Sequence, residues 1–141
     1  SVAASATVYG ACPTLPTGSM SVLGGNGKIG TTLTLGLHNP LATQPSGSLT
    51  VLLLGGASLP CGTVSLLGFG MAGVGAPGEL VINLIVPITI PGPAWTGVPA
   101  PIPLAIPASC TLIGGTVYVQ GGIVGGSIIG LTQGAQLTVG V

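Results

Sequence analysis

The stretch CTLIGGTVYVQGGIV, residues 110–124, indicates the fold class more clearly than any other part of the chain. At its centre, Val117 and Val119 point to one side, while the Thr, Tyr and Gln of residues 116–120 point to the other, which is the pattern of a strand with one face in a core. Glycine pairs at 114–115 and 121–122 predict turns or bulges that bracket this strand. We therefore expect a short strand with a single buried face.

Other segments repeat this pattern of short strands separated by glycine and proline. Residues 29–37 alternate with Leu33, Leu35 and Leu37 inward, and the preceding Asn26-Gly27 pair is a strong hairpin signal. Turn signals about every 8 to 12 residues predict one all-β domain over residues 1–141, a β-sandwich or jelly-roll-like fold of about eight to ten antiparallel strands. The further predicted strands are 19–23, 48–54, 61–69, 79–86, 127–131 and 135–141.

The first ten residues have two interpretations. Residues 1–10 form either an edge strand of their own sheet or a free N-terminal arm that adds as a strand to a neighbouring subunit. In the second case the subunit contact would use Val2, Val8 and Tyr9. The sequence alone leaves both open.

Residues 91–107 carry six of the thirteen prolines. Because proline cannot donate to a strand ladder, this segment predicts an edge strand or an extended covering loop. Trp95 within it is expected to plug one end of the core.

Charged side chains are nearly absent. Lys28 and Glu79 are the only members of the Asp, Glu, Lys and Arg group, and His38 is the one histidine, whereas about a quarter of an ordinary chain is charged. A single cation cannot neutralise a phosphate backbone, so nucleic acid is excluded as a partner. Net charge near zero also removes the repulsion that keeps copies of a protein apart. We therefore expect the chain to associate with itself.

Hydrophobic residues make up 47% of the chain, but glycine and proline interrupt them. The longest apolar run, residues 80–90, is shorter than the roughly 18 residues that a spanning helix needs, so no transmembrane segment is expected. The sequence starts at Ser1 without Met, which predicts a mature form after removal of a signal peptide and hence a secreted, extracellular protein.

Three cysteines, Cys12, Cys61 and Cys110, suit an oxidising compartment in which one pair forms a disulfide. A Cys61–Cys110 pair would close a loop of about 50 residues and stabilise the fold by about 4 kcal/mol on the entropic estimate. Cys12 would then remain, either to link subunits or as a buried free thiol.

No catalytic, cofactor-binding or metal-binding residues are predicted. His38 precedes Asn-Pro in a turn, and with Glu79 alone the chain lacks the two carboxyls that glycoside hydrolysis usually needs. One His with one Glu cannot complete a metal site, and no Gly-x-Ser-x-Gly elbow occurs. The glycine-rich stretches 24–30 and 121–126 lack the strand-to-helix context of a phosphate loop. We therefore expect no enzyme activity.

Two short motifs carry a resemblance to a known group of proteins. The first is YGAC at residues 9–12, and the second is LIGGTVYVQ at residues 112–120, preceded by the proline-rich residues 101–107. In these motifs the chain resembles small secreted β-sandwich domains of planctomycete-type bacteria. Where that family has Cys after Ala-Pro-Gly, this sequence has Glu79, so no disulfide pairing follows from the resemblance. It implies a secreted, surface or matrix character and no transferable activity.

These observations predict a secreted structural protein, the subunit of a homopolymeric filament, sheath or matrix at a bacterial surface. The alternative is a cell-surface module that binds carbohydrate or another surface ligand, with Trp95 and Tyr118 as its platform. A third idea, adsorption to an apolar or ice surface through Thr32 and Thr34, requires a regular threonine array.

Overall fold

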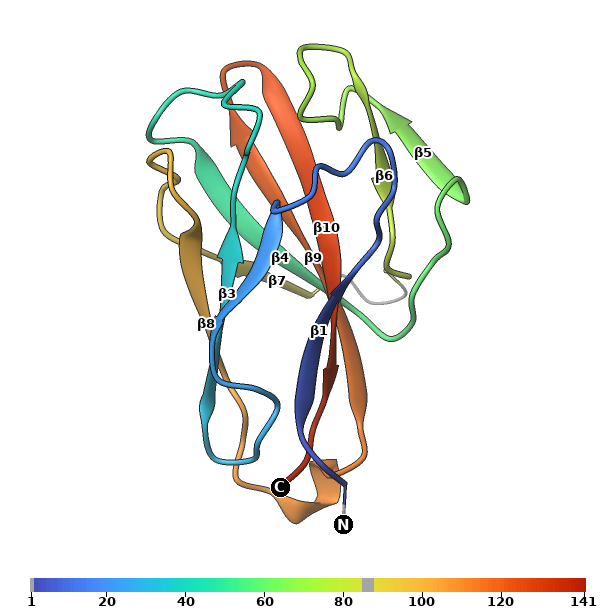
Figure 1. Ribbon diagram of the computed structural model, residues 1–141, viewed down its shortest axis with the longest axis vertical. Coiled ribbons are helices and arrows are strands. Elements are labelled where there is room, and N and C mark those ends of the chain that lie inside the picture. Colours follow the sequence, from blue (N-terminus) through green and yellow to red (C-terminus); the bar gives the residue numbers. More distant parts are fainter. Residues whose placement is uncertain (1, 85–87) are drawn as a thin grey trace.

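A computed structural model describes residues 2–84 and 88–141 and shows ten strands and one short 3₁₀-helix within them (Figure 1). The strands form three antiparallel sheets, which confirms the predicted all-β sandwich: β1-β10-β9-β4-β7 (sheet A), β2-β3-β8 (sheet B) and β5-β6 (the hairpin layer). The elements are β1 (Ser5–Tyr9), β2 (Met20–Gly24), β3 (Thr32–Leu37), β4 (Leu49–Gly55), β5 (Val64–Leu67), β6 (Pro77–Leu80), β7 (Ile88–Pro91), β8 (Ala100–Ala105), η1 (Cys110–Leu112), β9 (Thr116–Gly125) and β10 (Ile128–Thr138).

The main core lies between sheets A and B. The leucines of β3, Leu33, Leu35 and Leu37, are each 0% exposed, as their alternation predicts. They belong to the same buried cluster as Leu52 of β4 and Ile123 of β9. Burying each such side chain contributes about 1.5–3 kcal/mol, so this contact holds the two sheets together.

Strand β9 does not stop where the glycine pairs predict. It runs through Gly121 and Gly122 without the expected turn. The β9–β10 ladder does bulge at this point, but the extra residue lies in β10, between Leu131 and Gly134. A Cβ on Gly121 would collide with the side chain of Leu37 on sheet B. Glycine is therefore present to let the two sheets approach closely, because it is the one residue without a Cβ.

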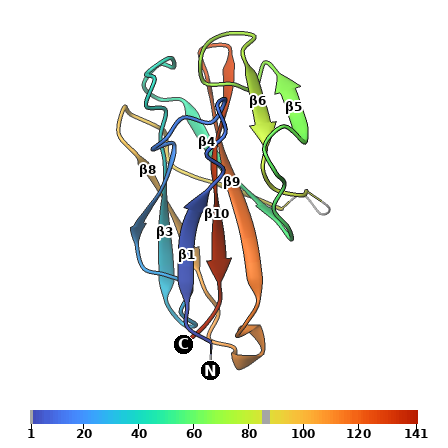
Figure 2. The same ribbon diagram turned by 45° about the vertical axis from the view of Figure 1, so that its right-hand side comes forward.

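A third layer covers part of the outer face of sheet A. The hairpin layer packs on the side of sheet A that faces away from sheet B, and the three layers are separate in Figure 2. A second buried cluster fills this contact, with Cys12, Leu15, Val81 and Leu131 at its centre. The face of β9 that the sequence predicts to be outward is thus partly buried.

The predicted strand 79–86 is only partly observed. Glu79 and Leu80 lie in β6, whereas residues 81–84 are not a strand, apart from an isolated bridge at Ile82, and residues 85–86 lie outside the described residues. The N–H of Val81 donates to the side chain of Gln120, and its carbonyl accepts from the hydroxyl of Tyr9 and from the backbone N–H of Leu59.

The predicted strands 127–131 and 135–141 are largely one strand, β10, with a register shift between Leu131 and Gly134. The bulge buries Thr132 and Gln133. The N–H of Gln133 donates to the hydroxyl of Ser19, 2.8 Å away, so a side chain supplies the partner that the ladder lacks there.

The proline-rich segment forms the edge strand β8, as predicted. The N–H of Ile106 donates to the carbonyl of Thr31 at 2.8 Å. Because backbone groups alternate in direction along a strand, Pro101 and Pro103 lie where the missing N–H would point away from β3. Trp95 is 3% exposed and belongs to the main core cluster, as expected of a plug.

The first residues lie within the fold of their own chain. Strand β1 pairs with β10 from Ser5 opposite Thr138 to Tyr9 opposite Gly134, at the edge of sheet A. Val8 packs against the main core cluster, and the carbonyl of Val2 accepts a hydrogen bond from the N–H of Val141. The edge-strand interpretation therefore holds, and the free-arm interpretation does not.

Replacing Gly121 with alanine tests the close approach of the sheets. Gly121→Ala should lower the free energy of unfolding by about 1–3 kcal/mol, because the new methyl group displaces Leu37. Gly24→Ala in β2 is the matched control, since a Cβ there meets nothing within 4 Å. Denaturant unfolding measures both variants; equal stability of the two would contradict the explanation.

Candidate functional site

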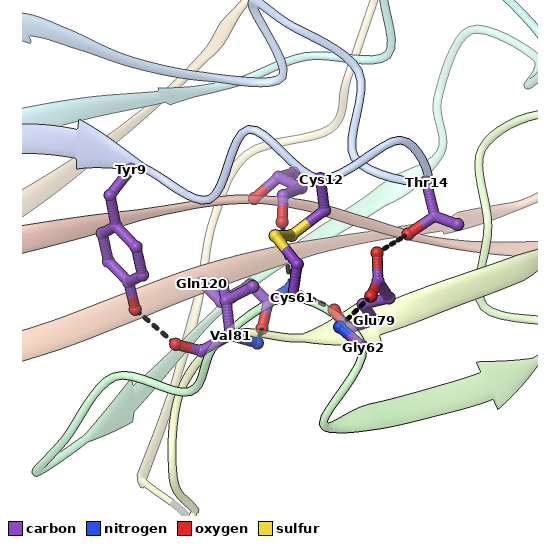
Figure 3. The surroundings of a disulfide bond; sticks show 9 residues. Tyr9, Cys12, Thr14, Cys61, Gly62, Glu79, Val81 and Gln120 are labelled. Atoms are coloured by element: carbon purple, nitrogen blue, oxygen red, sulfur yellow. Dashed lines mark hydrogen bonds between the residues drawn. A yellow bond between two sulfur atoms is a disulfide. The ribbon is translucent and has the colours of Figure 1, made fainter.

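A group of polar side chains lies where the hairpin layer meets sheet A. The disulfide at this junction joins Cys12 and Cys61, with a Cα–Cα distance of 5.6 Å (Figure 3). The predicted Cys61–Cys110 pair is therefore wrong, and the leftover thiol is Cys110, which is exposed. Cys110 begins η1, near the two chain ends and away from the hairpin layer (Figure 1), so it cannot reach Cys61.

Glu79 lies beside the disulfide and is 6% exposed. One carboxylate oxygen accepts from the hydroxyl of Thr14 at 2.6 Å, and the other accepts from the N–H of Gly62 at 2.5 Å. Thr14 follows Cys12 by two positions, and Gly62 follows Cys61 directly, so the carboxylate ties together both disulfide-bearing loops. Hydrogen bonds offset the cost of burying this group, which gives Glu79 a structural role.

Gln120 fastens the hairpin layer to sheet A. Its side chain is 0% exposed, and its carbonyl accepts from the N–H of Val81 at 3.0 Å. Its amide nitrogen donates to the carbonyl of Glu79 at 2.7 Å and to that of Thr132 at 2.9 Å. The sequence places Gln120 on a polar face of its strand, and no local signal shows that a distant hairpin covers that face.

Tyr9 adds a contact at the same junction. Its hydroxyl donates to the carbonyl of Val81 at 2.5 Å, and its ring meets that of Tyr118 edge-to-face, with centroids 6.0 Å apart. Burial raises the pKa of the Tyr9 phenol well above its usual range, and the neighbouring Tyr118 raises it further. The hydroxyl is therefore uncharged at neutral pH and donates this hydrogen bond.

The proposed ligand platform of Trp95 and Tyr118 is not formed. Trp95 is buried, and its indole N–H donates to Nδ1 of His38 at 3.0 Å, whereas Tyr118 packs on Tyr9. A sugar platform needs an exposed aromatic face, which Trp95 does not offer.

A shallow groove of about 420 Å³ lies next to the disulfide, between the end of β1 and residues 58–61. Its lining is mostly apolar, and the one titratable side chain in it is that of Tyr9. Within residues 2–84 and 88–141, no three His, Cys, Asp or Glu side chains come together as metal ligands would.

No known protein family, curated protein or solved structure matches the chain. The resemblance to secreted domains of planctomycete-type bacteria therefore stays a prediction. In the part of the chain that the structure describes, no helix has the length and apolar character to cross a membrane.

Replacing Gln120 with leucine tests its role as a fastener. Gln120→Leu leaves the N–H of Val81 and two carbonyls without their partner, so it should cost about 3 kcal/mol of unfolding free energy. Amide hydrogen exchange should rise first in residues 77–82. Gln136→Leu is the matched control, because Gln136 is exposed on β10, and it should change stability by less than about 0.5 kcal/mol. Equal effects of the two variants would contradict the role of Gln120.

Proposed function

We propose that the protein is a secreted structural protein whose β-sandwich subunits assemble with one another into an extracellular filament, sheath or matrix. The observation that carries this proposal is the lack of charge on the surface. Glu79, the only acidic side chain in the sequence, is buried. Lys28 is therefore the one exposed side chain of the Asp, Glu, Lys and Arg group in the part of the chain that the structure describes.

Exposed apolar side chains support self-association. Large hydrophobic residues are exposed on β2, β4, β5, β7, β9, β10 and the loops, and no charges stand between them to oppose contact with another uncharged surface. Each Å² of apolar surface removed from water contributes about 25 cal/mol. These residues are Val2, Leu23, Leu41, Leu49, Leu67, Val74, Ile88, Val98, Leu112, Val124, Ile129 and Val141.

The disulfide supports an extracellular location. Disulfides persist in oxidising environments and are rare in the cytosol. The Cys12–Cys61 bridge closes a loop of 49 residues, which stabilises the folded state by about 4 kcal/mol on the entropic estimate. A subunit that gains so much from a disulfide suits a compartment in which the bond survives.

Electron microscopy and sedimentation of the native, non-reduced protein test the proposal. We expect regular filaments or sheets whose amount changes less than about twofold between pH 4 and 10 and between 0.05 and 1 M NaCl, because few groups ionise and no charge contacts are screened. Cys110→Ser serves as the control, since it removes disulfide linkage through the exposed thiol. Dispersed monomers under all of these conditions would refute self-assembly.

A further inference from the structure

We propose that two copies of this chain pair face to face across a row of three exposed side chains, Leu49, Val124 and Ile129, on the outer face of sheet A. This inference rests on the proposed function, because it names one contact of that assembly. The row is defined by these three residues and is called the apolar row below.

The register of the strands places the apolar row on one line. Leu49 of β4 is directly opposite Val124 of β9, and Val124 is directly opposite Ile129 of β10. Paired residues in adjacent strands share a face of the sheet. The three side chains are 69%, 39% and 38% exposed, in that order, so they form one continuous apolar strip across three strands.

The apolar row begins where the cover of the hairpin layer ends. The next row on the same face is Val51, Gly122 and Leu131. Leu131 in that row is 4% exposed, because it belongs to the cluster beneath the hairpin layer. The same sheet face is therefore covered within the chain at one end and open at the other.

Pairing through the strand edges at β7 and β8 is disfavoured. Pro101 and Pro103 lie on the open side of β8 and offer no N–H donors to an incoming strand. The N–H of Gly92 donates to the carbonyl of Thr50 at 3.0 Å, so by alternation Pro91 occupies an outward position on β7. On this side of the sandwich, association through a sheet face is therefore favoured over association through an edge.

The charge distribution favours a second copy as the occupant. The backbone of Lys28 forms an isolated β-bridge with Gly140, at the end of the molecule where both termini lie. The apolar row adjoins the β9–β10 turn at the opposite end (Figure 1). A charged partner would lose hydration at the row without finding an opposite charge. An identical uncharged face carries no charge whose hydration would be lost on contact.

A two-fold axis parallel to the strands makes the row complementary to itself. It places Leu49 of one copy over Ile129 of the other, and Val124 over its own equivalent, as in an isologous interface. Three side chains cover less than the roughly 800 Å² per partner of a standard stable interface. The pairing is therefore a weak, reversible contact that other contacts of an assembly would reinforce.

Sedimentation velocity over a range of concentrations tests this pairing, with every protein carrying Cys110→Ser. Leu49→Glu and Ile129→Lys should each weaken dimerisation about tenfold or more, because an unpaired charge is buried. An equimolar mixture of these two variants should regain dimers, because the new carboxylate of one copy lies over the new ammonium group of the other. Val124→Lys places its new ammonium group over the same group of a second copy. This variant should dimerise neither with Leu49→Glu nor with Ile129→Lys.

Leu67→Glu is the matched control, because Leu67 is 82% exposed on β5 and lies outside the row; it should dimerise like the wild type. All row positions are exposed, so thermal unfolding should confirm that each variant is folded. Row variants that dimerise like the wild type, or a wild type that stays monomeric, would overturn the inference. If the row variants still form filaments, the proposed function stands and this contact does not. If the wild type forms dimers but no filaments, this contact stands and the proposed function does not.

Discussion

The attachment of the hairpin layer to sheet A depends on the buried amide of Gln120. A chain with one acid and one base cannot join these two layers through ion pairs, so hydrogen bonds of neutral groups act there together with the apolar contact. Gln120 gives all of its bonds to backbone groups at the junction, on Val81, Glu79 and Thr132. The Cys12–Cys61 disulfide and the carboxylate of Glu79 reinforce the same junction. The single acid of the chain is thereby used inside the protein and is lost to the surface.

Because Glu79 is the only acid and is buried, the surface carries no acidic side chain. The exposed surface consists mainly of glycine, proline, hydroxyl groups, a few amides and apolar side chains, with Lys28 as its one charge of the Lys, Arg, Asp and Glu group in the described residues. Such a surface has no electrostatic means of choosing a partner, so shape and apolar burial remain. Prolines that close the edges of β7 and β8 restrict association further. These features together support the proposal that the chain associates with itself through sheet faces.

The sequence predicts the parts of the fold that depend on local periodicity. The leucines of β3 and the proline-bearing edge strand β8 follow from alternation and from the missing N–H of proline. The disulfide could not be predicted, because Cys61 lies 49 residues from both Cys12 and Cys110, so loop-closure entropy is equal for both pairs. Gly121 was ambiguous because glycine serves turns and close packing alike. The role of Gln120 depends on a hairpin distant in the sequence, which alternation cannot reveal.

Calorimetric dilution of the assembled protein at several temperatures tests most directly whether uncharged, apolar faces drive association. Burial of apolar surface gives a negative heat-capacity change on association, and contacts without charges are not weakened by NaCl. We expect both a negative heat-capacity change and an association that NaCl does not weaken. A heat-capacity change near zero, together with association that weakens steeply as NaCl is added, would contradict it.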